Sequence, residues 1–152
     1  MSDERLDHYQ RLQRMYLSAP INRIYRPLIA LSEGEAEISI ELQEQFHHAG
    51  ATVHGSVYFK MLDDAAYFAA STLEREHFLL TASFTLYLER PVASGMIRAS
   101  SRVVSRTRQQ FIAEAVLFDA RNREIARGSG VFMRGRERLL NAAGYPDPTP
   151  ET

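Results

Sequence analysis

Hydrophobic and polar residues alternate along much of this chain, and the alternation predicts where its strands lie. In the stretch 34–43, Ala36, Ile38, Ile40 and Leu42 alternate with acidic and polar residues, which is typical of a strand with one buried side and one solvent-facing side. Similar runs predict four further strands, which cover residues 79–89, 96–107, 111–119 and 124–134. The short links between these four strands indicate antiparallel neighbours.

Two segments have helical rather than strand periodicity. Residues 3–18 carry apolar side chains at three- and four-residue spacing, which predicts an amphipathic helix that ends at Ala19-Pro20. Residues 54–73 are apolar nearly all round, as is typical of a buried helix. One buried helix between a first strand and four consecutive strands predicts an α+β fold, in which an antiparallel sheet of five to six strands curls around that helix.

The pattern indicates one main domain with an extension at each end. A chain of 152 residues is long enough to bury a substantial core in a single domain. We expect an N-terminal helix and a connecting segment at residues 1–32, and the main domain at 33–138. The Pro-rich tail at 139–152 is expected to be disordered.

Composition is that of an ordinary soluble globular protein, with 45% hydrophobic and 24% charged residues. No apolar run approaches the roughly 18 to 20 residues that cross a bilayer, so we expect no membrane association. The acidic, polar N-terminus does not resemble a secretory signal, and a cytoplasmic location is therefore expected. The absence of cysteine excludes disulfides and thiolate chemistry.

Charge is distributed unevenly along the chain although the formal net charge is −1. Residues 1–89 carry seven basic and thirteen acidic side chains, whereas residues 90–138 carry eleven arginines and four acids. The arginines could be solvated strand residues, or they could form an anion site for phosphates, which suits the planar guanidinium. Nucleic acid is not an expected partner, because aromatic residues are not interleaved with these arginines as in RNA-binding modules.

Two adjacent carboxylates, Asp63 and Asp64, interrupt the buried helix. Because successive helical residues point about 100° apart, the two can hardly be equally buried. Asp64 lies four residues after Lys60, which is the spacing of a helical ion pair. Asp63 has the aromatic residues Phe59 and Tyr67 one turn away on either side. A carboxylate held among aromatics is a candidate general base or nucleophile, although pairing with Lys60 would account for either acid.

The turn that precedes this helix is a candidate binding site for a developing negative charge. The first N–H groups of a helix are unpaired and can hold an anion or a carbonyl oxygen that is becoming one. Gly55, in His54-Gly55-Ser56, is therefore of interest, although glycine is also an ordinary turn residue there. His47 and His48 lie in the preceding loop. Their spacing fits no metal site, so we expect no bound metal.

These residues resemble a motif of the hotdog-fold thioesterases, in particular the branch typified by the phenylacetate-degradation thioesterase. That family carries N-x-x-G-x-x-H-G-G, followed by a helix with L-A-D or L-A-E, and the acid falls nine residues after the motif histidine. Here His54 takes the place of that histidine, and the ninth residue after it is Asp63. The resemblance extends over about residues 35–134, including the Arg90-Pro91 strand end and the closing strand ARGSGVFMR.

The resemblance implies a hotdog-fold acyl-coenzyme A thioesterase that needs no cofactor. It implies that Asp63 activates water or attacks the thioester directly, and that the Gly55 N–H polarises the thioester carbonyl. It further implies that Thr81 orients the nucleophilic water, while Arg106 and Arg108 contact coenzyme A phosphates. The family builds its active site across a homodimer interface, and many members pair dimers into tetramers. The acyl group stays open, as does an acyl carrier protein in place of coenzyme A.

Two positions depart from the family motif. Ser56 replaces the second glycine, and we expect it to contact the substrate. His54 corresponds to the motif histidine, and we expect it to be one of the catalytic residues. The family asparagine is replaced by His48, or by His47 if a one-residue gap falls at Gly50. Imidazole, like an amide, can donate or accept a hydrogen bond beside Asp63. The alternative function is a hotdog protein that binds acyl thioesters without hydrolysing them, as a carrier or sensor.

Overall fold

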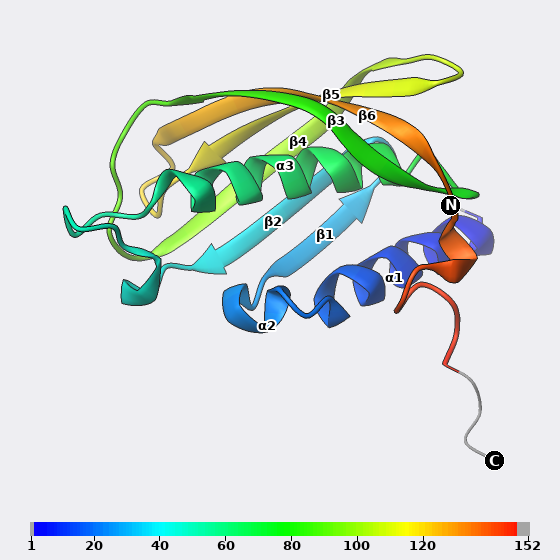
Figure 1. Cartoon of the computed structure of the whole chain (residues 1–152), viewed down its shortest axis with the longest axis horizontal. Coiled ribbons are helices and arrows are strands. Elements are labelled where there is room, and N and C mark those ends of the chain that lie inside the picture. The colour runs from blue at the N-terminus through cyan, green and yellow to red at the C-terminus, as the bar shows by residue number, and fades with distance from the viewer. Residues whose placement is uncertain (1, 149–152) are drawn as a thin grey trace.

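The computed structural model describes residues 2–148, and a six-stranded antiparallel sheet is its main element. The sheet curves around helix α3 (Gly55–Ser71), which lies along its concave face (Figure 1). The strand order is β1-β2-β4-β5-β6-β3, so that β1 and β3 form the two edges. The strands are β1 (Leu28–Ser32), β2 (Glu35–Glu41), β3 (His77–Leu88), β4 (Met96–Arg106), β5 (Gln110–Phe118) and β6 (Glu124–Arg138).

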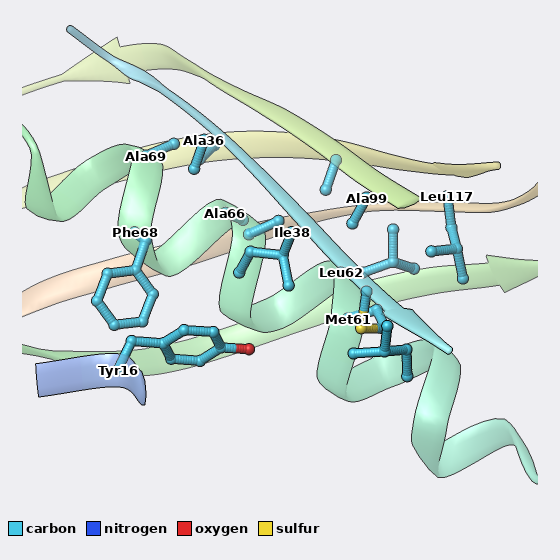
Figure 2. Packing of buried hydrophobic residues seen from close by; sticks show 14 of the residues in the cluster. Tyr16, Ala36, Ile38, Met61, Leu62, Ala66, Phe68, Ala69, Ala99 and Leu117 are labelled. Carbon is cyan, nitrogen blue, oxygen red and sulfur yellow. The ribbon is translucent and has the colours of Figure 1, made fainter. Parts of the chain in front are cut away.

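Small side chains on α3 let the helix approach the sheet closely. Ala65, Ala66, Ala69 and Ala70 are fully buried, and together they form a narrow strip along the helix. Figure 2 shows Met61, Leu62, Ala66 and Ala69 of α3 against residues of β2, β4 and β5, which include Ile38, Ala99 and Leu117. This close packing explains why the segment is apolar on nearly every side.

The predicted N-terminal helix is present as α1 (Asp3–Ser18), and it packs beside α3 through one apolar face. The ring of Tyr16 meets Phe68 of α3 edge-on, with ring centroids 4.7 Å apart (Figure 2). After Ala19-Pro20 comes the single-turn helix α2 (Asn22–Tyr25). A 3₁₀ turn, η1 (Glu44–Phe46), follows β2 and leads towards the turn at the start of α3. No helix among residues 2–148 is long and apolar enough to cross a membrane.

The structure differs from the sequence prediction at both extensions. Residues 28–32, expected as part of a connecting segment, form β1, which pairs antiparallel with β2. The tail was expected to be disordered from residue 139. Instead it forms the 3₁₀ turn η2 (Leu139–Asn141), and residues up to Asp147 then make hydrogen bonds to side chains of α1. Residues 149–152 of the predicted tail lie outside the described residues.

Polar contacts explain why the tail is ordered. Arg14 of α1 donates hydrogen bonds to the carbonyl oxygens of Gly144, Tyr145 and Pro146 at 2.8–2.9 Å. The buried His8 bridges the Tyr145 hydroxyl, 2.8 Å from Nδ1, and the carbonyl oxygen of Ser71, 2.8 Å from Nε2. The prolines of the tail therefore do not prevent order, because the carbonyl groups are satisfied by side chains of another element.

Candidate active site

Asp63 lies on the side of α3 that faces β3, where it is half-buried. The Thr81 hydroxyl of β3 donates a hydrogen bond of 2.9 Å to Asp63 Oδ1. Asp63 Oδ2 has no hydrogen-bond partner among residues 2–148. One oxygen of the carboxylate is thus held in position while the other is available to a water molecule or a substrate.

A β-bulge in β3 places Thr81 in this position. The register with β6 shifts between Thr81, which pairs with Phe132, and Ser83, which pairs with Val131. The extra residue is Ala82, and it reverses which residues face the helix. Before the bulge Leu79 and Thr81 face α3, and after it Phe84 and Leu86 do so. In a strand without the bulge, Thr81 would lie on the opposite side of the sheet from Phe84 and Leu86 and would point away from Asp63.

Burial raises the pKa of Asp63 to about 6, and desolvation is the largest cause. The hydrogen bond from Thr81 and the charge of Lys60 act in the opposite direction, whereas the neighbouring charge of Asp64 adds to the rise. A carboxyl group with a pKa near 6 is mostly ionised at neutral pH, yet it is a stronger base than an exposed aspartate. These are the properties of a general base for chemistry at neutral pH.

Asp64 is engaged in a local network and is less available for chemistry. Its Oδ2 accepts hydrogen bonds from Lys60 Nζ at 2.5 Å and from the Tyr16 hydroxyl at 2.7 Å. The Lys60 ammonium also lies over the Tyr16 and Tyr25 rings, 5.4 and 4.9 Å from their centroids. The ion pair expected from the spacing of Lys60 and Asp64 is therefore present within α3. The hydrogen bond from Tyr16 to Asp64 links α3 to α1.

A largely apolar cavity of about 640 Å³ opens beside Asp63. Its walls come from α3, from β3, from the end of α1 with the link to α2, and from the C-terminal segment. The aromatic side chains Tyr16, Tyr67, Phe68 and Phe78 line it together with Met15. The Tyr67 hydroxyl donates a 2.9 Å hydrogen bond to the carbonyl oxygen of Leu79, which ties α3 to β3 next to the bulge. This cavity could not be predicted from the sequence, because the residues that line it are far apart along the chain.

The His54-Gly55-Ser56 turn begins α3 as predicted. His54 is the N-cap, and its Nδ1 accepts a hydrogen bond of 3.0 Å from the Ser56 N–H. The Ser56 hydroxyl lies 2.7 Å from the same nitrogen. The Gly55 N–H has no acceptor among residues 2–148, as expected for the first residue of a helix. A Cβ at Gly55 would lie 3.1 Å from Leu88 Cδ1, so glycine lets β3 approach the turn.

The two loop histidines make different contacts. His48 accepts a hydrogen bond of 2.9 Å from the Gly50 N–H at Nδ1, and its Nε2 lies 3.0 Å from the Thr52 hydroxyl. His47 uses Nε2 to donate to the carbonyl oxygen of Ala93 at 2.7 Å. To contact a substrate through Nε2, His48 would have to exchange its contact with Thr52.

The two halves of the predicted site are separate within one chain. Gly55, His48 and Leu88 line a second hollow of about 220 Å³, which does not include Asp63 or Thr81. Asp63 lies eight positions after Gly55, which is about 12 Å of helix length. A single chain therefore does not bring the Gly55 N–H and the Asp63 carboxylate to one reacting group.

The predicted phosphate-binding arginines lie at the turn between β4 and β5. Arg106 donates to the carbonyl oxygen of Leu73 at 3.4 Å, and its guanidinium lies 5.8 Å from the centre of the Phe111 ring. Arg108 is exposed and its side chain makes no ion pair within the described part of the chain. Arg134 forms an ion pair with the buried Glu74, so its role is structural. Across residues 2–148, no group of three or more His, Asp or Glu side chains could hold a metal ion.

Comparison with known proteins identifies relatives of this fold. Residues 50–126 match the family model described as the thioesterase superfamily. The PaaI protein of E. coli, from the phenylacetic acid degradation operon, superposes with a TM-score of 0.80 at 18% identity, over 88% of this chain and 96% of that one. A thioesterase family protein of Silicibacter pomeroyi gives a TM-score of 0.78 at 21% identity, over 84% and 99%. The predicted hotdog fold is confirmed.

A curated protein of Saccharolobus solfataricus is also similar in sequence. It is named as a candidate esterase, and it is 23% identical over 107 residues, which are 70% of this chain and 71% of that protein. The matched family region, 50–126, contains Gly55, Asp63 and Thr81. It contains neither α1 nor the C-terminal segment that complete the cavity beside Asp63.

Proposed function

This chain belongs to the thioesterase superfamily, and from that premise we propose that it hydrolyses acyl-coenzyme A thioesters to the free acid and coenzyme A. The observation that carries the proposal is the Asp63 carboxylate. One of its oxygens is held by Thr81, the other is free, its pKa is raised to about 6, and it borders an apolar cavity. A carboxylate in such surroundings is suited to activating water beside an apolar acyl group.

In the proposed reaction Asp63 Oδ2 accepts a proton from a water molecule as the water oxygen attacks the thioester carbon. The oxyanion that forms accepts a hydrogen bond from the Gly55 N–H at the positive end of the α3 dipole. When the C–S bond breaks, the proton on Asp63 passes to the leaving thiolate. Direct attack by Asp63, which would give an anhydride that water then cleaves, is the alternative use of the same carboxylate.

The separation of Gly55 from Asp63 supports a homodimer in which each site takes its N–H from one chain and its carboxylate from the other. A pair of such dimers could form a tetramer. The His54-Ser56 turn would then contact the thioester end of the substrate, and His48 or His47 would supply the polar group that replaces the family asparagine. Arg106 and Arg108 are proposed to bind phosphates of coenzyme A. The exposed guanidinium of Arg108 supports this role.

The test is thiol release from acyl-coenzyme A by the purified protein and by Asp63→Asn. Loss of a general base costs about 10²- to 10⁴-fold in rate, so Asp63→Asn should lose that much turnover. Asp64→Asn is the matched control, since it changes the adjacent carboxylate on the same helix, and it should keep most of the activity. A variant pair with the opposite result would contradict the assignment. Saturable binding of acyl-coenzyme A without turnover would instead indicate a carrier or sensor.

A further inference from the structure

We propose that the cavity beside Asp63 binds a neutral, apolar acyl chain of medium length. We further propose that α1 and the C-terminal segment, which lie outside the family-matched residues 50–126, select that chain. The inference rests on the proposed function, because it assigns the acyl half of the substrate to the site that contains Asp63.

The walls of the cavity show where selection takes place. The family-matched region supplies the reactive end, with Asp63 and Thr81, and the aromatic floor. Most of the remaining lining comes from the end of α1 and the link to α2, which include Met15 and Ala19, and from the C-terminal segment, which includes Ala142. A ligand whose reactive group is at Asp63 would therefore extend its other end between these two extensions.

Hydrogen bonds and ring contacts fix this wall in place before any ligand binds. Tyr16 of α1 donates to Asp64 and packs edge-on against Phe68 (Figure 2). The C-terminal segment runs beside α1 (Figure 1), where Arg14 and His8 hold it. Because this wall is already ordered, binding does not have to provide the free energy of ordering it. Its shape can therefore discriminate between acyl groups.

The charges around the cavity exclude an anionic acyl group. Lys60 is the single cationic side chain among the described lining residues, and it is paired with Asp64. Asp63 and Glu137 add negative charge to the lining. A second carboxylate on the acyl group would therefore lose its hydration without gaining a cationic partner. The apolar lining and the lack of a free cation both favour a neutral hydrocarbon chain.

The size of the cavity favours a chain longer than acetyl. Pockets of about 300 to 1,000 Å³ bury most of a drug-sized ligand, and this cavity has about 640 Å³. An acetyl group would leave most of the apolar lining in contact with water. Each further methylene that is buried should improve binding about fourfold until the cavity is filled.

The experiment measures kcat/KM for acetyl-, butanoyl-, hexanoyl-, octanoyl- and dodecanoyl-coenzyme A, with adipoyl-coenzyme A as the anionic partner of hexanoyl. The value of kcat/KM should rise from acetyl- to octanoyl-coenzyme A. The value for adipoyl-coenzyme A should be at least tenfold lower than that for hexanoyl-coenzyme A. Ala142→Phe narrows the cavity and should lower the octanoyl-to-acetyl ratio of kcat/KM at least tenfold. Ala19→Phe, on the α1 side, should act in the same way and serves as a second variant if Ala142→Phe does not fold.

Ala30→Phe is the matched control. Ala30 is exposed on β1 and is not part of the cavity, so this variant should keep the wild-type profile. A flat chain-length profile, equal use of adipoyl and hexanoyl, or a profile that neither cavity variant changes would overturn the inference while leaving the proposed hydrolysis intact.

A binding measurement separates the two proposals if hydrolysis is absent. Calorimetry with S-alkyl coenzyme A thioethers of the same lengths needs no turnover. If no thioester is hydrolysed, but binding strengthens with chain length and Ala142→Phe removes this gain, then the acyl site stands and the proposed enzyme activity fails. If binding does not depend on chain length, the acyl site fails as well.

Discussion

Asp63 should determine the pH dependence of turnover. A general base must be ionised to accept a proton, so the rate should fall as the pH drops through about 6, where burial has placed the pKa of Asp63. Thr81→Val removes the hydrogen bond that stabilises the charged form. The pKa of Asp63 should therefore rise further, and the acid limb of the kcat/KM profile should move to higher pH. If the acid limb of the kcat/KM profile is the same in Thr81→Val as in the wild type, a group other than Asp63 controls this limb.

The two adjacent carboxylates should have opposite effects on stability at pH 8. The folded-state pKa of Asp63 is raised above the value of 3.8, so the folded protein holds this proton more tightly than the unfolded chain does. Ionised Asp63 therefore destabilises the fold above about pH 6, and the penalty disappears as the pH falls below 3.8. Asp63→Asn should raise the Tm, by about 2–4 °C for each kcal/mol recovered.

Asp64→Asn should instead lower the Tm. Asp64 accepts hydrogen bonds from Lys60 and Tyr16, and bonds to a charged partner contribute about 1.5–3 kcal/mol. Calorimetric scans of both variants at pH 8 and pH 5 measure the difference between their Tm values. This difference should be smaller at pH 5. If both substitutions destabilise the protein equally at pH 8, Asp63 is a structural residue like its neighbour.

Elements with a strong local pattern could be predicted from the sequence. The alternation of Ala36, Ile38 and Ile40 indicated β2, and all three side chains are buried. The apolar stretch that follows Gly55 indicated α3, and the helix is buried along most of its length. Spacing also indicated the pair of Lys60 and Asp64. Each of these features depends on residues that are close together in the sequence. The spacing of apolar and charged residues is therefore enough to predict it.

Elements that depend on distant partners could not be predicted in this way. β1 has a weak apolar pattern, and it becomes a strand because β2 offers an edge with which to pair. The tail is ordered by Arg14 and His8, which lie about 130 residues earlier in the chain. An alternation rule does not detect the bulge at Ala82, since the sequence there alternates through Ala82, Phe84 and Leu86 without interruption. Such features arise from tertiary contacts that override local preference.

The edges of the sheet indicate how two copies of the molecule would meet. The outer side of β3 pairs with no strand among residues 2–148, and it is twelve residues long. Leu80, Tyr87 and Leu88 on this strand and Phe59 on α3 are exposed apolar side chains. A long apolar edge strand needs cover, and antiparallel pairing with a second copy around a two-fold axis supplies it.

The position of such an axis is consistent with a shared active site. Asp63 contacts Thr81, Gly55 lies against Leu88, and the Phe59 ring meets the Phe84 ring edge-on. Position 59 lies midway between 55 and 63, and position 84 lies close to midway between 81 and 88. A two-fold axis level with Phe59 and Phe84 would therefore bring Gly55 of each chain beside Asp63 of the other, and the same axis would pair the two β3 edges.

We expect two inactive variants to restore activity when they are mixed. Gly55→Pro removes the N–H while suiting the first position of a helix, and the extended φ and ψ of His54, −62° and 142°, fit a residue before proline. Loss of an oxyanion donor should cost about 10²- to 10³-fold. In a mixed dimer with Asp63→Asn, one site has both native groups.

The measurement is thiol release after Gly55→Pro and Asp63→Asn are unfolded together and refolded in equal amounts. Half of the dimers should be mixed, each with one intact site, so turnover should return to about a quarter of the wild-type value. Each variant refolded alone is the control, and light scattering of the mixture should give the mass of a dimer or of a pair of dimers. A monomer, or a dimeric mixture as inactive as its components, would mean that the reacting groups do not meet across this axis.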